Sequence, residues 1–179
     1  GPWLDRLVSH LDPPAVTLDA LLPVHWGQSG GELLQSARLD ELRRHEGVTA
    51  HGTLRFAEFC EFLSGMDVAV DLFDHTLERE YAMVTRTVVA LASGLPAIHP
   101  PFTEVSPLIE EYGAGWLLEE GDLESLAGVL DTIRADRSLV AEKAAGAQRL
   151  AADRLDPPVA VRPLLEILES AGAKGGSSP

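Results

Sequence analysis

The sequence of 179 residues contains one cysteine, two lysines and no long hydrophobic run. The single cysteine, Cys60, excludes a disulfide framework and any multi-cysteine zinc or iron–sulfur site. No segment approaches the roughly 20 apolar residues of a membrane span, and no signal-peptide pattern opens the chain. We therefore expect a cytoplasmic domain without direct membrane insertion, and leave open a peripheral contact between a longer protein and a membrane.

Positive charge is scarce as well. The sequence has 14 Lys+Arg against 28 Asp+Glu, which gives a formal net charge of -14. Proteins that bind nucleic acid need clustered lysines and arginines to displace the counterions of the phosphates, so we expect no nucleic-acid partner. The same acidity disfavours docking on anionic lipids. The preference for arginine over lysine favours a GC-rich bacterial source.

The hydrophobic content of 45% is sufficient for the core of one compact domain. The pair Gly1-Pro2 resembles the remnant that a tag protease leaves behind, and the small polar residues at 172–179 predict a flexible tail. We therefore expect a single domain over residues 3–171.

Apolar runs typical of buried strands alternate with segments of helical periodicity. Strands are expected at 16–25, 48–51, 66–73, 96–99 and 115–118. Helices are expected at 3–11, 32–45, 55–64 and 82–92, then from 106 and from 122, and finally at 137–154 and 158–171. This alternation with short connections predicts a Rossmann-like, three-layer α/β/α domain around a parallel sheet.

Histidines follow four of the expected strands. In a doubly wound sheet the ligand binds at the carboxyl ends of the strands, so these side chains predict a polar rim for a ligand. No histidine or aspartate cluster has the spacing of metal ligands, and we expect no metal site. The four residues are His25, His51, His75 and His99.

The helix expected at 82–92 follows a strand-end loop and begins near Tyr81 or Ala82. Its free backbone N–H groups and its dipole would suit a phosphate group. Arg86, about one turn into the helix, would add a bidentate charge, or would instead pair on the surface with Glu78 or Glu80. No GxGxxG, GxxxxGK[ST] or GxSxG pattern occurs, and the sequence identifies no catalytic residue.

A series of loose motifs follows in a characteristic order, at residues 51–54, 56–59, 65–70, 90–98, 113–118 and 121–126. Over residues 16–150, this series resembles the C-terminal, donor-binding domain of GT-B fold glycosyltransferases, especially the retaining family 4 class (glycosyl transferases group 1). The resemblance implies a nucleotide-diphosphate sugar as the donor substrate, with no cofactor. The contacts that it implies are His25, Gly27, Gly52, Thr53, Glu80, Tyr81, Thr85, Arg86 and Thr87.

Two departures from the family pattern stand out. The family's pair of glutamates falls on Tyr81 and Val89, while the lysine of a family variant aligns with Arg86. The family's first strand in this domain and its N-terminal acceptor-binding domain have no counterpart in the sequence. The resemblance therefore implies the donor-binding half of a bacterial glycosyltransferase, inactive without its N-terminal partner domain. The acceptor would be a polysaccharide, a glycolipid or a metabolite.

Two other functions remain open. The loss of the glutamate pair and the net charge of -14 are also expected of a degenerate GT-B-like domain, kept as a non-catalytic binding or scaffolding module. A related nucleotide-sugar epimerase would share the same architecture, although no sequence feature favours it. Affinity for a nucleotide sugar would discriminate the scaffolding module from the two enzymes.

Overall fold

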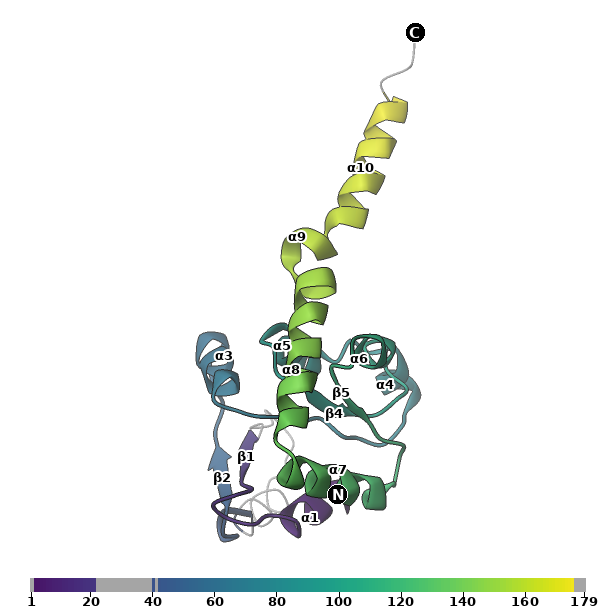
Figure 1. Cartoon of the computed structure of the whole chain (residues 1–179). Helices are drawn as coiled ribbons and strands as arrows, with labels where there is room; N and C mark the ends of the chain where they lie inside the picture. The colour runs from purple at the N-terminus through teal and green to yellow at the C-terminus, as the bar shows by residue number, and fades with distance from the viewer. Residues whose placement is uncertain (1, 22–39, 41, 176–179) are drawn as a thin grey trace, which may run out of the picture.

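The computed structural model describes residues 2–21, 40 and 42–175. It contains five short strands: β1 (Leu18–Leu21), β2 (Val48–His51), β3 (Ala69–Val70), β4 (Ala97–His99) and β5 (Gly115–Leu117). Its helices are α1 (Pro2–Val8), α3 (Phe56–Ser64), α4 (Leu77–Tyr81), α5 (Thr85–Ala92), α6 (Ser106–Tyr112), α7 (Leu123–Ala135), α8 (Ser138–Leu150), α9 (Pro157–Ala160) and α10 (Arg162–Gly175), with a π-helical turn at Ala151–Leu155. Figure 1 shows β4 and β5 among the helices α5, α6, α7 and α8, with β1 and β2 to one side, and α9 and α10 continuing from α8 away from the sheets.

The strands pair in parallel, as predicted, but they form two sheets. β1 pairs with β2, and Leu18 lies opposite Val48. In the other sheet β4 lies between β3 and β5, so that Ile98 is flanked by Val70 and Trp116. The prediction of a parallel α/β domain is confirmed, and the separation of the sheets is an additional finding.

The hydrophobic core lies on both faces of β4. On one face, the buried side chains of Leu91, Ile109 and Leu150 come from α5, α6 and α8. On the other face, Ile98 packs with Leu126 of α7 and with residues of α1 such as Leu7. Because alternate side chains of a strand point to opposite faces, β4 links two clusters and creates the predicted helix–sheet–helix layering.

Two helices begin or end where local sequence signals predict it. Gly113 follows α6 with a φ of 60°, a left-handed conformation that glycine adopts without strain. The Asp122 side chain accepts a 2.9 Å bond from the Ser125 amide at the start of α7. Hydrogen bonds from the Ser125 side chain and backbone also lower the pKa of the Asp122 carboxyl. These caps fix the ends of two helices that cover β4.

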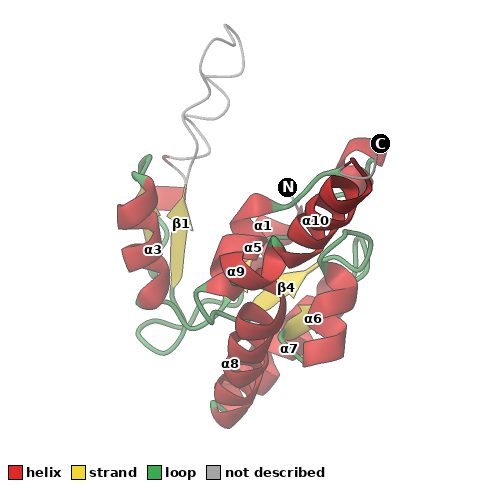
Figure 2. Cartoon of the chain, turned by 90° about the horizontal axis from the view of Figure 1, so that it is seen from above, coloured by secondary structure: helices red, strands yellow, loops and turns green. Residues whose placement is uncertain are grey.

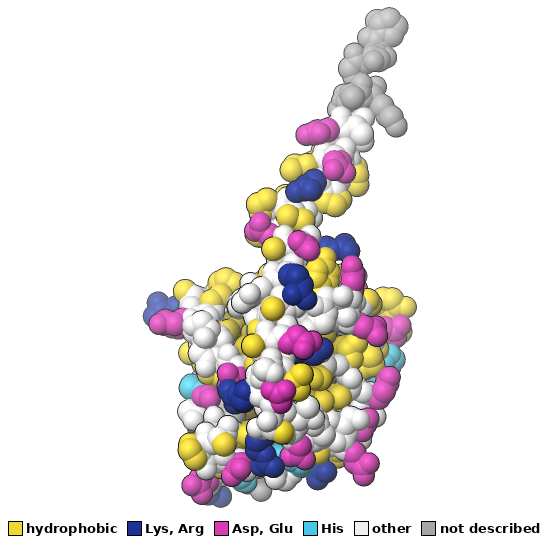
Figure 3. Space-filling view, in the orientation of Figure 1, with side chains coloured by type: hydrophobic (Ala, Val, Ile, Leu, Met, Phe, Trp, Pro, Cys, Tyr) yellow, Lys and Arg dark blue, Asp and Glu magenta, His cyan; other side chains and the backbone are white. Residues whose placement is uncertain are grey.

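Two boundaries differ from prediction. α5 begins at Thr85, not near Tyr81, because α4 ends at Ala82 in extended backbone and the Thr85 amide donates to Met83 O. α10 continues to Gly175, into the segment predicted as a tail. Figure 3 shows hydrophobic side chains along this projecting helix. Within the described residues, no helix combines the length and the apolar character that crossing a membrane requires.

Candidate functional site

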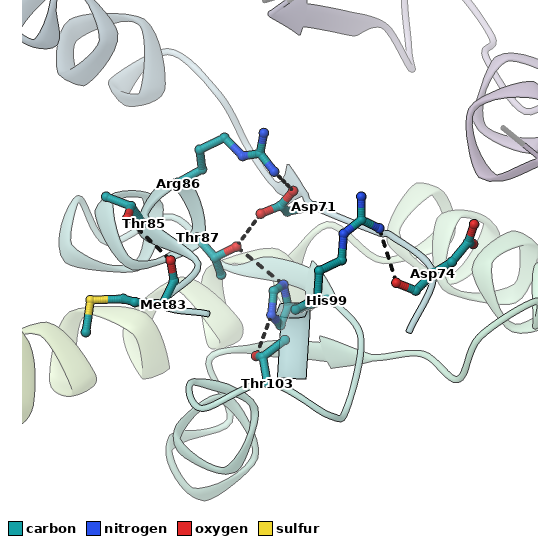
Figure 4. A network of polar contacts seen from close by, with 9 residues as sticks. Asp71, Asp74, Met83, Thr85, Arg86, Thr87, His99 and Thr103 are labelled. Atoms are coloured by element: carbon teal, nitrogen blue, oxygen red, sulfur yellow. Dashed lines mark hydrogen bonds and ion pairs between the residues drawn. The ribbon is translucent and has the colours of Figure 1, made fainter. Parts of the chain in front are cut away.

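The first turn of α5 lies where β3 ends, as Figure 4 shows. Val84 precedes the helix and supplies no side-chain cap, and the first turn contains no acidic residue. Among the described residues, no acceptor takes the backbone N–H of Arg86 or Thr87. An uncapped helix start with free amides is a favourable place for an anion, because the helix dipole adds partial positive charge.

Asp71, directly after β3, holds the first turn of α5 through two side chains. Its Oδ1 atom accepts a 3.0 Å bond from the Arg86 guanidinium, and its Oδ2 atom accepts a 2.8 Å bond from the Thr87 hydroxyl. The Asp71 side chain is 17% exposed and that of Arg86 is 74% exposed. The largely buried carboxylate therefore holds the Arg86 side chain in place, while the guanidinium stays in contact with solvent. The alternative pairing of Arg86 with Glu78 or Glu80 is wrong.

The network continues into the core through His99, the last residue of β4. Its Nδ1 atom lies 3.3 Å from Thr87 Oγ1, and its Nε2 atom lies 2.8 Å from Thr103 Oγ1. Ser106 extends the network, since its Oγ atom lies 2.8 Å from that of Thr103 and donates to Pro100 O. Burial lowers the pKa of His99 from 6.5 to about 4, although Asp71 opposes the shift. The imidazole is therefore neutral at pH 7 and donates from one nitrogen only.

An aromatic cluster lies beside this network. The ring of Phe73 packs edge-on against His99 and Phe102, and the Arg79 guanidinium lies 5.0 Å from its centroid. His75 packs edge-on against Phe102 as well. These contacts place a cationic group and an exposed imidazole on the α4 side of the carboxyl end of β3, next to the start of α5.

The structure brings together only part of the predicted site. Thr85, Arg86 and Thr87 share the first turn of α5, and the Thr85 hydroxyl donates to Met83 O. Glu80 lies on the neighbouring helix α4, with its carboxylate 3.2 Å from His75 Nε2, and Tyr81 ends that helix with 75% of its surface exposed. These five residues thus belong to two consecutive helices, α4 and α5, which follow β3 in the chain.

The remaining predicted contacts lie elsewhere. Gly52 and Thr53 follow β2 in the other sheet, where both are exposed. Next to them His51 Nε2 lies 2.7 Å from Asp19 Oδ1, so this histidine pairs across β1 and β2. His25 and Gly27 lie outside the described residues.

Sequence reasoning missed Asp71, the residue that orients Arg86. The available signal was its position, since it is the first carboxylate after the apolar run Val68-Ala69-Val70. Within the described part of the chain, no group of three His, Cys, Asp or Glu side chains could hold a metal ion. The polar groups at this strand end are the Asp71 carboxylate, the Arg86 guanidinium, the Thr87 hydroxyl and the His99 imidazole, with the first-turn amides of α5 beside them. Arg79, His75 and Glu80 add further charged or polar groups on the α4 side.

A cavity of about 640 Å³ opens onto this site. It runs between β1 and β3, and its lining includes Asp71, Arg86 and Thr87 at the carboxyl end of β3. At the opposite end it is lined by Arg134 and Arg137, near the end of α7. The strand-end site is therefore continuous with the space that separates the two sheets.

The solved structures reported below, to which the chain is similar, have the GT-B fold. The chain is similar to Anabaena Alr3699/HepE in complex with UDP-glucose, at 21% identity and a TM-score of 0.72, over 95% of this chain and 46% of that one. It is also similar to WaaG, a glycosyltransferase involved in lipopolysaccharide biosynthesis, at 17% identity and a TM-score of 0.64, over 98% of this chain and 44% of that one. No protein-family model matches the chain, and the search of curated proteins found no match.

The chain spans slightly less than half of the structures that it matches. It has the fold of one half of a GT-B glycosyltransferase, so the predicted fold and the resemblance to this class are confirmed. The Alr3699/HepE protein has also been solved with UDP and glucose, at 22% identity to this chain. At these identities the likeness establishes the fold of a glycosyltransferase-like domain.

Proposed function

We propose that this chain is the donor-binding half of a bacterial glycosyltransferase, and that the first turn of α5 receives the diphosphate of a nucleotide sugar. The observation that carries the proposal is the anchoring of the exposed Arg86 by the half-buried Asp71 beside two unpartnered amides. The Alr3699/HepE complex with UDP-glucose, which shares the fold, supports a nucleotide sugar as the ligand class.

The chain's own groups supply the chemistry of binding. Arg86 would offer a charge-assisted bond, and the amides of Arg86 and Thr87 would donate to phosphate oxygens without side-chain rearrangement. A net charge of -14 repels a diphosphate at long range, but salt screens exposed charges beyond about 8–10 Å. Local donors therefore decide the affinity, and no resident cofactor is needed for it.

Transfer of the sugar to an acceptor is proposed only for the complete glycosyltransferase, of which this chain would be one half. GT-B reactions take place between two domains, as the family resemblance implies, so the chain alone is expected to bind without turning over. The acceptor is proposed to be a polysaccharide, a glycolipid or a metabolite. The missing N-terminal domain would be the partner that supplies its binding surface.

A non-catalytic binding or scaffolding module is the second candidate. Two observations favour it: the positions of the family's glutamate pair hold Tyr81 and Val89, and the charge of Arg86 is already compensated by Asp71. Such a module would keep the fold and the Asp71–Arg86 pair for packing, with no affinity for nucleotides. Ligand binding therefore discriminates the two candidates.

The test is a thermal-denaturation screen of the chain with UDP, GDP, dTDP and their glucose conjugates, each at up to millimolar concentration. A ligand present at 100 times its Kd contributes about 2.7 kcal/mol to stability, which such a screen resolves. We expect one base to raise the melting temperature, with the matching nucleotide sugar at least as effective. An unchanged melting temperature with every nucleotide and nucleotide sugar would contradict donor binding and favour the scaffolding module.

Replacing Arg86 with alanine is expected to weaken binding of the preferred nucleoside diphosphate by about 1–3 kcal/mol, or roughly 5- to 150-fold in Kd. The matched control is Arg137→Ala, because Arg137 also pairs with an aspartate, Asp67, at 2.7 Å and its side chain is 56% exposed. Asp67 precedes β3, whereas Asp71 follows it. Isothermal titration would measure both. Equal affinities for the Arg86 variant and the parent would remove Arg86 from the phosphate site.

A further inference from the structure

A buried set of polar contacts leads from the start of α5 into the core. Five contacts of 2.8–3.3 Å join its members one after another. Figure 4 shows the outer part, from Asp71 to Thr103, and Figure 2 shows that β4, which ends in His99, lies among α5, α6 and α7. We call this set the buried network, and its members are, in order, Asp71, Thr87, His99, Thr103, Ser106 and the carbonyl oxygen of Pro100.

The hydrogens of the buried network can be assigned from its inner end. A carbonyl oxygen only accepts, so the Ser106 hydroxyl donates to Pro100 O. The Ser106 Oγ atom must then accept from the Thr103 hydroxyl, and Thr103 Oγ1 must accept from His99 Nε2. A neutral imidazole has no second proton, so the Nδ1 atom of His99 is bare.

The outer end of the buried network is one proton short. Thr87 has a single hydroxyl proton, which it donates to Asp71 Oδ2. The contact between Thr87 Oγ1 and His99 Nδ1 then brings two lone pairs together at 3.3 Å, the longest of the five distances. A count agrees, because five contacts share the four protons of three hydroxyls and one neutral imidazole. One added proton would give every contact a donor.

The Asp71–Arg86 pair controls the affinity of the buried network for this proton. Burial disfavours a charged His99, and Asp71 is the carboxylate that opposes this effect. The Arg86 guanidinium lies 3.0 Å from Asp71 Oδ1 and offsets the charge of the carboxylate. Arg86 therefore keeps the added proton off, and an anion that offsets the charge of Arg86 would favour the proton.

Other charged groups face the buried network from neighbouring elements. On the α4 side, the Arg79 guanidinium lies over the Phe73 ring and Glu80 pairs with His75. Glu104 is exposed on the turn before α6. Carboxylates and guanidinium groups keep their charges at neutral pH, but the exposed His75 could also gain a proton beside an anion. A test must therefore separate His75 from the buried network.

We propose that the buried network takes up one proton when Arg86 engages an anionic ligand, so that binding at the start of α5 is coupled to protonation. The identity of the anion, a nucleotide sugar, rests on the proposed function. The proton comes from solvent to Asp71, whose partly exposed carboxylate lines the cavity. Asp71 then donates to Thr87, and the Thr87 hydroxyl turns to donate to His99 Nδ1.

The coupling has two consequences. The proton belongs to the interacting groups together, so Asp71 and His99 titrate as one unit with one midpoint. Linkage is reciprocal, so the proton strengthens anion binding by the same factor by which the anion strengthens proton binding. Affinity for the anion therefore rises as the pH falls toward the range in which the buried network is protonated.

A titration without any ligand tests the response of the buried network. Arg86→Gln removes the positive charge that an anion would offset, so the protonation midpoint is expected to rise by about one pH unit or more. NMR of isotope-labelled chains follows the carboxyl carbon of Asp71 and the Nδ1 atom of His99, and we expect one midpoint at both. Arg137→Gln, which removes the partner of Asp67, is the matched control and is expected to leave the midpoint unchanged.

Calorimetry with UDP-glucose tests the coupling to a ligand. Titrations at pH 6 in two buffers of different ionisation enthalpy count the protons taken up on binding. The phosphate ionisation near pH 6 belongs to a terminal phosphate, which a nucleotide sugar lacks, so the protons are those of the protein. We expect net uptake by the parent and by His75→Gln. Thr87→Val breaks the link between Asp71 and His99 and is expected to show about half that uptake or less.

The outcomes separate the coupling from the proposed function. An unchanged midpoint in Arg86→Gln, or different midpoints for Asp71 and His99 in that variant, would overturn the coupling. Equal proton uptake by the parent and by Thr87→Val would overturn it as well. A chain that does not bind UDP-glucose or any other nucleotide sugar would contradict the proposed function instead, and the ligand-free titration would then decide by itself whether the buried network responds to the charge of Arg86.

Discussion

Replacing Gly146 with alanine is expected to destabilise the chain by about 3 kcal/mol, whereas the same change at Gly128 is expected to stabilise it by about 1 kcal/mol. Both glycines lie inside helices, α8 and α7, where intrinsic propensity favours alanine. A Cβ atom on Gly146 would lie 2.5 Å from the carbonyl oxygen of Tyr112 and 2.6 Å from that of Gly113. At Gly128 a Cβ atom meets nothing within 4 Å. The same substitution is therefore expected to change the free energy of unfolding in opposite directions at the two positions.

The physical cause is the close crossing of α8 over the end of α6. Backbone atoms cannot rotate away as a side chain can, so the Gly146 variant must separate the two helices and loosen the core cluster around Ile109 and Leu150. Urea denaturation followed by circular dichroism measures both variants against the parent. A Gly146→Ala chain as stable as the parent would show that α8 can move away from α6 without cost.

Much of the fold was predictable because its signals are local. Gly113 ends α6, Asp122 begins α7, and the apolar pair Ala97-Ile98 in β4 identifies a buried strand. The separation of the strands into two sheets, between β1 and β3, could not be predicted from such local signals. The resemblance implied an absent strand, but the position of an open edge depends on pairing between residues distant in sequence, which periodicity does not encode.

The candidate site was predictable only in part, for a similar reason. Thr85, Arg86 and Thr87 are neighbours in sequence, so any helix start in this region brings them together. The partner of Arg86 was not predicted, because Asp71 comes from a different element and lies 15 positions away in the chain. Glu78 and Glu80 were nearer in sequence, but the extended backbone at Ala82 assigns them to a separate helix, α4.

Acidification from pH 7 to pH 4 is expected to cost the folded chain about 3 kcal/mol through His99 alone. The pKa of this buried imidazole falls to about 4 on folding, against 6.5 in the unfolded chain, because burial disfavours the charged form. Between these values the unfolded chain binds a proton that the folded chain does not, so stability falls as the pH falls through that range. Below about pH 4 both states are protonated at this site, and the effect is complete.

The measurement is the free energy of unfolding at half-unit steps from pH 7.5 to pH 3.5, for the parent, His99→Gln and His75→Gln. Carboxylates elsewhere in the chain also titrate on acidification, so the decisive quantity is the difference in slope between the pH profiles of the variants. His99→Gln is expected to flatten the profile between pH 6.5 and 4, even if the loss of its bonds to Thr87 and Thr103 lowers stability at every pH. His75, with a half-exposed side chain beside Glu80, serves as the control for replacing a histidine with glutamine outside the buried network. Parallel profiles for the parent and the His99 variant would mean that the imidazole takes up its proton without disrupting the network that joins β4 to the start of α5.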